Sequence, residues 1–162
     1  MFDSATYQKR RCNLREKVGD GLILILGNNE APANYPDNTY KFRQDSSFVY
    51  FFGHSHPGYA GIIDANSGEE YFFGDDVDMD DIIWMGLKEI VGNAIARHQK
   101  IHFLPPYRYD NMLLLEELTG IRTSMLKQHA SVELIKAIVS LRSSKEPCEI
   151  AEIDKACNVG YE

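Results

Sequence analysis

"LILILG", residues 22–27, is a run of five aliphatic side chains that ends at a glycine. A continuous apolar run of this length is typical of a β-strand that is covered on both faces, because a strand with one face in water alternates apolar and polar residues. We therefore predict a strand at a central position of a sheet, with other elements packed on both of its sides.

The segments around this strand predict helices and further strands. Upstream, Asp3 or Ser4 can cap an amphipathic helix that Gly19 ends. Downstream, short apolar and aromatic runs separated by turn residues predict an antiparallel meander, and a later run predicts one more strand. The predicted strands are "SFVYFFG" (47–53), "YAGIID" (59–64), "EEYFFGD" (69–75) and "KIHFL" (100–104), and later helices are predicted within 87–98, 109–120, 131–142 and 146–159.

Composition bounds the class of protein. A chain of 162 residues fits one compact domain, and its net charge of -7 without a basic cluster argues against a nucleic-acid partner. No apolar run reaches the roughly 18 to 20 residues of a membrane span, and the N-terminus has no signal-peptide core. Three widely spaced cysteines fit a reducing compartment. We expect a cytoplasmic protein without a membrane partner.

A polar cluster, "RQD" at residues 43–45, directly precedes the first aromatic run. It is either an active-site loop at the end of a strand or a structural bracket, in which Arg and Asp hold the preceding Asn/Pro-rich loop by charge-assisted hydrogen bonds. In the predicted strand, Phe48, Tyr50 and Phe52 share one face. A structural bracket predicts that the Arg43→Ala substitution lowers stability.

Metal and catalytic motifs give weaker signals. His54 and His56 have the H-x-H spacing that places two imidazoles on one side of an extended segment, but two nitrogens do not make a site. A run of aspartates lacks the glycine and glutamate of a calcium loop and reads better as a solvated helix-capping turn. Nucleophile and phosphate-loop motifs are missing, so we assign no catalytic residue and no metal ligand. The aspartates are Asp75, Asp76, Asp78, Asp80 and Asp81.

The stretch "TYKFRQDSSFVYFFGHSHPGYAGII" resembles the signature of the N-terminal domain of aminopeptidase P, the Xaa-Pro aminopeptidases, which is related to the N-terminal domains of prolidase and creatinase. "IIWMG" is similar to the family's Ile-Trp-x-Gly segment, and "LRSSKEPCEIAEIDKA" is similar to the stretch that links the two domains of these enzymes. The residues that match the first piece are Tyr40, Phe42, Arg43, Gln44, Asp45, Ser46, Phe48, Tyr50, Phe51, Gly53 and Pro57.

This resemblance implies an α/β fold with a mixed central sheet flanked by helices, ribonuclease-H-like in topology. It also implies that residues 1–142 form an N-terminal domain and that residues 143–162 begin a helix linking it to a C-terminal catalytic domain. In the family, that second domain binds two divalent metals, usually manganese, through two Asp, one His and two Glu. No cofactor is expected in this chain. Trp84 is the residue that the family would place at a subunit contact or near the substrate entrance.

Three functional hypotheses follow. The leading one is the non-catalytic N-terminal domain of a cytoplasmic Xaa-Pro aminopeptidase, serving oligomer assembly and access of peptides with proline at the second position. The alternative is a free-standing binding or oligomerisation module, which predicts that the last helix folds its apolar face onto its own domain. A third is a metal-dependent enzyme that uses His54, His56 and the aspartate cluster.

Overall fold

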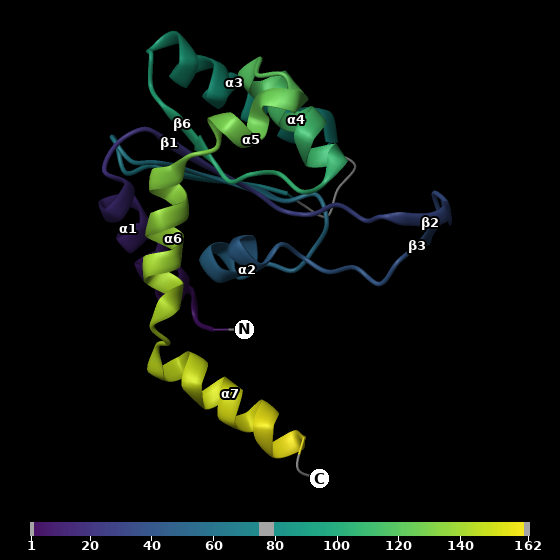
Figure 1. The fold of residues 1–162 in the computed structure, drawn as a ribbon, viewed down its shortest axis with the longest axis vertical. Coiled ribbons are helices and arrows are strands. Elements are labelled where there is room, and N and C mark those ends of the chain that lie inside the picture. The colour runs from purple at the N-terminus through teal and green to yellow at the C-terminus, as the bar shows by residue number, and fades with distance from the viewer. Residues whose placement is uncertain (1, 75–79, 161–162) are drawn as a thin grey trace.

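A four-stranded mixed sheet forms the centre of the computed structural model, which describes residues 2–74 and 80–160, with side chains of the second range described from residue 86 onward (Figure 1). The strand order is β5-β4-β1-β6. β1 pairs with β4 in antiparallel and with β6 in parallel orientation, and β4 pairs with β5 in antiparallel orientation. The strands are β1 (Leu22–Leu26), β4 (Ala60–Asp64), β5 (Glu70–Phe73) and β6 (Ile101–Phe103).

Helices cover both faces of this sheet, as the unbroken apolar run of β1 predicts. Ile23 and Ile25 point into one hydrophobic cluster together with residues of α1, α2 and α6, whereas Leu22 and Leu24 point into a second cluster with residues of α3, α4 and α5. The helices are α1 (Ser4–Val18), α2 (Ser46–Phe52), α3 (Asp80–Ala96), α4 (Tyr109–Thr119), α5 (Leu126–His129), α6 (Val132–Ser143) and α7 (Pro147–Val159), with a 3-10 turn at Thr123–Met125. Within the described part of the chain, no helix has both the length and the apolarity of a membrane span.

The aromatic run that was predicted to be a strand is the helix α2, so that prediction is wrong. The side chain of Asp45 accepts hydrogen bonds from the backbone N–H groups of Ser47 and Phe48 and so caps the helix. Gly53 ends it with a φ of 74°, a left-handed conformation that favours glycine. The rings of Phe48 and Phe52, one helical turn apart, stack with centroids 5.1 Å apart.

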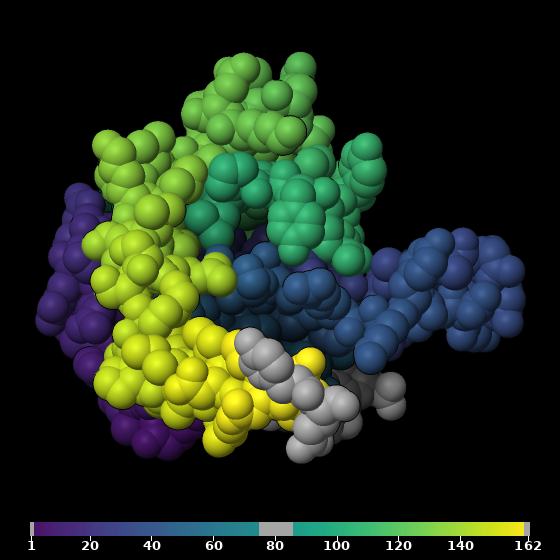
Figure 2. Space-filling view, turned by 60° about the horizontal axis from the view of Figure 1, so that its bottom comes forward, coloured from purple at the N-terminus to yellow at the C-terminus, as the bar shows by residue number. Residues whose placement is uncertain are grey.

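The long polar loop after β1 contains a hairpin of its own, β2 (Pro32–Tyr35) and β3 (Asn38–Thr39). Every residue of β2 is exposed. Figures 1 and 2 show this hairpin projecting from the body of the domain. It therefore adds nothing to the core, and the loop between β1 and α2 is an excursion on the surface of the domain.

The last helix, α7, also lies outside the core. No residue from Pro147 to Val159 is buried, and the side chains of Ile150 and Ile153 are 48% and 47% exposed. Figure 2 shows α7, in yellow, on the outer surface of the domain. The prediction of the free-standing module, in which this helix buries its apolar face against its own domain, therefore does not hold.

Candidate functional site

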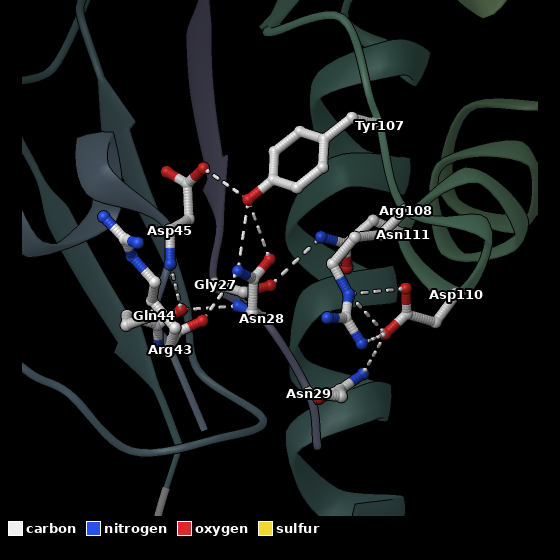
Figure 3. Close-up of polar contacts among 10 residues, drawn as sticks. All are labelled: Gly27, Asn28, Asn29, Arg43, Gln44, Asp45, Tyr107, Arg108, Asp110 and Asn111. Atoms are coloured by element: carbon white, nitrogen blue, oxygen red, sulfur yellow. Dashed lines mark hydrogen bonds and ion pairs between the residues drawn. The ribbon is translucent and has the colours of Figure 1, made fainter. Parts of the chain in front are cut away.

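A polar cluster gathers where β1 ends, at the start of α2 and in the loop between β6 and α4 (Figure 3). Gln44 is its buried centre, with 7% of its surface exposed. Its side-chain oxygen Oε1 accepts hydrogen bonds from the backbone N–H groups of Asn28 and Asp45, at 2.5 and 2.8 Å. Its side-chain nitrogen Nε2 donates to the backbone carbonyl of His56 at 2.6 Å. One side chain thus satisfies backbone groups in three separate segments, because an amide can both accept and donate.

The close packing around Gln44 requires a glycine at position 27. A Cβ atom there would lie 2.6 Å from the carbonyl oxygen of Tyr59 and 3.0 Å from the amide of Gln44. Real Cβ atoms do not approach backbone atoms this closely. The glycine that ends "LILILG" therefore lets the loops meet at the end of β1.

Asp45 joins the start of α2 to the loop before α4. One of its oxygens caps α2, and the other accepts a hydrogen bond from the hydroxyl of Tyr107 at 3.0 Å. The hydroxyl also contacts the side-chain amide of Asn28, whose nitrogen donates to it at 3.1 Å. Burial is the largest cause that raises the pKa of Tyr107. The hydrogen bond with Asn28 acts to lower this pKa, but the charge and the hydrogen bond of Asp45 add to the effect of burial, and the pKa is raised. The phenol therefore stays protonated and serves as a donor.

A second polar group continues the cluster along α4. Asp110 accepts hydrogen bonds from Arg108, at 3.1 Å from Nε, and from the side chain of Asn29 at 3.2 Å. Burial acts to raise the pKa of Asp110, but the bonds from Arg108, Asn29 and the backbone of Asn111 outweigh it and lower that pKa. Asn111 donates to the carbonyl of Gly27 at 3.1 Å and so ties α4 to the end of β1.

A groove with a volume of about 390 Å³ opens beside these residues. Its polar wall consists of Asn29, Asp110 and Asn111, and its apolar part includes Leu26 and Leu87. The polar side chains of the wall already bond to one another or to the backbone. The cluster can therefore order loops and shape a surface, but it offers no nucleophile with an adjacent base.

The structure separates the predicted motif residues into core and surface. Phe48 is fully buried, Gln44 and Asp45 bond within the cluster, and Tyr40 is 65% exposed. Arg43 contributes its backbone carbonyl, which accepts from Asn28, while its guanidinium is exposed and bonds to no described residue. In the structure Gln44 and Asp45 form the bracket, and Arg43 contributes only its backbone carbonyl to it. Phe42 is half-buried, Ser46 is exposed and Gly53 ends α2.

The candidate metal ligands do not converge within the described part of the chain. His54 and His56 are both exposed, and their rings lie against Phe72 and Tyr59, respectively. No group of three His, Cys, Asp or Glu that could hold a metal ion occurs among the described residues. The side chains of the aspartate run lie outside the described residues, as does the side chain of Trp84, although Trp84 belongs to α3.

His102 is a structural residue of β6. It is 1% exposed, its Nε2 faces the carbonyl of Asp20 at 3.0 Å, and its Nδ1 lies 2.6 Å from the hydroxyl of Ser131. Because a carbonyl only accepts, Nε2 carries the proton and Nδ1 accepts from Ser131. Ser131 in turn caps α6 by accepting from the N–H of Leu134 at 3.1 Å.

We expect the domain to lose stability in mild acid through His102. Burial and the charge of Lys100 lower the pKa of His102 against the opposing effects of Asp20 and Glu133. The folded state thus favours the neutral ring. The stabilisation that this preference provides is complete at pH values above the pKa of histidine in the unfolded chain, about 6.5, and it is lost as the pH falls through the lower pKa of His102 in the folded state. Urea unfolding between pH 7.5 and 5 measures it, with a slope of at most about 1.4 kcal/mol per pH unit for one proton.

A matched pair of variants assigns this slope. His102→Gln removes the titrating ring and is expected to flatten the dependence of the unfolding free energy on pH, although it also lowers stability at every pH. His129→Gln removes an exposed histidine and is expected to leave the slope unchanged. Equal slopes in the parent and in His102→Gln would contradict the assignment.

Together, a mixed sheet between two helical layers and a polar cluster that orders the loops at the end of β1 define the class of this chain, an α/β domain. Residues 7–130 match the family model of the aminopeptidase P N-terminal domain. The chain therefore belongs to this family, which confirms the resemblance inferred from the sequence.

Known proteins agree with this assignment. The chain is 30% identical to the Xaa-Pro dipeptidase of Homo sapiens over 124 residues, which are 74% of this chain and 23% of that protein. Among solved structures, a histidine-to-alanine variant of Escherichia coli aminopeptidase P aligns with a TM-score of 0.68 and 18% identity, over 96% of this chain and 42% of the other. Zinc-substituted aminopeptidase P from Escherichia coli, in complex with product, aligns with a TM-score of 0.55 and 16% identity, over 74% and 33%. The chain thus spans about a quarter of the human relative, and the structural neighbours share its fold.

Proposed function

We propose that this chain acts as the non-catalytic N-terminal domain of a metal-dependent Xaa-Pro peptidase, whose substrates carry proline at the second position. The observation that carries the proposal is the family match over residues 7–130. The Xaa-Pro dipeptidase name of the human relative supports the substrate class. The exposed helix α7 supports the domain division, because residues 143–162 then begin a link to a catalytic domain instead of completing the core.

The metals of such a peptidase do not fit the described residues of this chain. A two-metal hydrolase needs bridging carboxylates that hold two ions about 3.5–4 Å apart. The residues described here provide no group of three potential ligands. In the proposed function, two divalent ions, manganese in the first instance, bind in the catalytic domain of the parent, and the residues of this chain form structure and surface.

The proposal extends to assembly and access. We place Trp84, in α3, at a subunit contact or near the substrate entrance of a homo-oligomeric, cytoplasmic parent. An indole at such a boundary combines a large apolar area with one N–H donor, which suits a contact surface. Light scattering on the parent and on its Trp84→Ala variant measures whether this residue contributes to the oligomer.

The activity is tested on the protein encoded by the complete reading frame. We expect two Asp, one His and two Glu of a metal centre within about 300 residues after Glu162, the length of two ordinary domains. The purified parent is expected to cleave the bond before proline in Xaa-Pro peptides with manganese and to lose that activity with a chelator. A reading frame without these five residues, or a parent inactive on Xaa-Pro peptides with manganese, zinc or cobalt, would remove the proposal.

A further inference from the structure

Arg10 of α1 is a buried cation inside a ring of aromatic side chains. Only 3% of its side chain is exposed. Its guanidinium carbon lies 4.1 Å from the ring centroid of Tyr50, 5.0 Å from that of Phe2 and 5.7 Å from that of Tyr7. Its Nη1 donates to the carbonyl of Tyr50 at 3.1 Å, which ties α1 to α2. A guanidinium with so little access to water needs opposing charge close by.

The opposing charges come from the first turn of α7. The Nε of Arg10 donates to Glu146 at 3.0 Å, and its Nη2 lies 3.5 Å from a carboxylate oxygen of Glu149. The same two glutamates form the capping box of α7, in which the backbone N–H of Glu146 donates to Glu149 at 2.9 Å. One buried cation thus pairs with both carboxylates that start the helix.

The end of α6 is held by the same group of residues. The hydroxyl of Tyr50 donates to the carbonyl of Leu141 at 3.3 Å, and the guanidinium carbon of Arg142 lies 5.5 Å from the ring centroid of Tyr50. Between the two helices, residues 144 and 145 are exposed. The joint between α6 and α7 therefore has fixed groups on both sides and a solvent-exposed connection in the middle.

Beyond its first turn, α7 has no comparable anchor among the residues that the structure describes. None of its residues is buried, and Val159 near its end is 75% exposed. Helices usually take their direction from an apolar face packed against the core. In α7 that source is missing, so the direction of the helix depends on Glu146, Glu149 and the cation that binds them.

We infer that Arg10 is a positioning residue that fixes the direction of α7 relative to the domain. The ion pairs gain strength from burial, and the planar guanidinium restricts the angle at which both carboxylates can approach. Lys9 pairs with the same Glu146 at 3.2 Å, but its side chain is 67% exposed, so water and salt screen this pair. The inference holds for the chain itself, and only its consequence, the placement of a following domain, rests on the proposed function.

The direction of α7 is measured by electron-spin distance measurements on the full 162-residue chain. Nitroxide labels are attached to Cys157 on α7 and to a cysteine introduced by Lys136→Cys on α6, after Cys12 and Cys148 are replaced by serine. We expect one narrow distance distribution for this background. Adding Arg10→Met, which keeps an unbranched side chain in the aromatic ring, is expected to widen the distribution at least about twofold, because a helix without its anchor samples many orientations.

Lys9→Met is the matched control, since it removes the exposed cation from the same carboxylate. It is expected to leave the width unchanged. Glu149→Gln removes half of the charge pairing without changing shape, and it decides the question if Arg10→Met does not fold; it is expected to widen the distribution. Three results would overturn the inference. The first is an unchanged width of the distance distribution in a folded Arg10→Met variant, and the second is an unchanged width in Glu149→Gln when Arg10→Met does not fold. The third is equal widening by Lys9→Met and Arg10→Met. None of these results bears on peptide hydrolysis by the parent, which tests the proposed function separately.

Discussion

Replacing Phe48 with alanine is expected to lower the free energy of unfolding by about 3–5 kcal/mol, the usual cost of truncating a buried aromatic side chain. Phe48 is 0% exposed and stacks on Phe52, and its ring centroid lies 6.4 Å from that of Tyr59 and 6.2 Å from that of Phe72. The substitution leaves a cavity between α2 and the sheet that these rings cannot fill without moving. Urea unfolding followed by far-ultraviolet circular dichroism measures the loss.

Tyr40→Ala is the control, because Tyr40 belongs to the same sequence motif but is 65% exposed. It is expected to change the unfolding free energy by no more than about 0.5 kcal/mol, as surface substitutions usually do. A small loss in Phe48→Ala would mean that α2 does not seal this side of the core. A large loss in Tyr40→Ala would mean that the hairpin β2–β3, which Tyr40 follows, contributes to stability after all.

The local pattern of the sequence predicts the sheet well because β1 is buried on both faces. A short run of continuous apolar residues suits a strand with both faces buried, and such a strand lies at the centre of a sheet. The turn residues between β4 and β5 specify an antiparallel pair. The aromatic run 47–53 misleads for the same reason. A short, fully apolar segment has no distinct period, and the helical signs were the cap Asp45 and the spacing of Phe48, Phe51 and Phe52.

The polar cluster could be predicted only in part. The motif identifies Gln44 and Asp45, but their partners Asn28 and Tyr107 lie 16 and 62 residues away along the chain. No local pattern connects such positions, since the contact exists only after β1 and β6 have paired in parallel. A polar residue shortly after a buried strand, as Asn28 is after Leu26 and Gly27, was the available signal.

The contact between Arg10 and the start of α7 shows the same limit at a longer range. The periodic apolar residues of the last helix and the charged "KRR" of the first are visible in the sequence, but Arg10 and Glu146 are 136 residues apart. An arginine in an amphipathic helix is ordinarily a solvated residue. Its burial depends on Tyr50 of α2 together with Phe2 and Tyr7, and the local pattern of the sequence did not predict that α2 is a helix.

Gln44→Ala is expected to be the second strongly destabilising substitution, by about 3 kcal/mol. It deprives the N–H groups of Asn28 and Asp45 and the carbonyl of His56 of their partner. Each buried polar group left unpaired costs about 1–3 kcal/mol, and partial access of water to the loop reduces the sum. Thermal and urea unfolding of the variant measure the loss, and hydrogen exchange at the amide of Asn28 reports where it arises.

Two further substitutions separate the roles of neighbouring residues. Gln44→Glu keeps an acceptor for both N–H groups but turns a buried carboxylate oxygen toward the carbonyl of His56, so we expect a loss at least as large as that of Gln44→Ala, about 3 kcal/mol or more. Arg43→Ala removes an exposed guanidinium and is expected to cost no more than about 0.5 kcal/mol. If Arg43→Ala were as costly as Gln44→Ala, the ion-pair bracket first inferred from the sequence would be correct in solution. A third outcome is that both Gln44→Ala and Arg43→Ala change the unfolding free energy very little. In that case Asp45 and Asn111 alone would hold the end of β1, and the cluster would tolerate the loss of its buried centre.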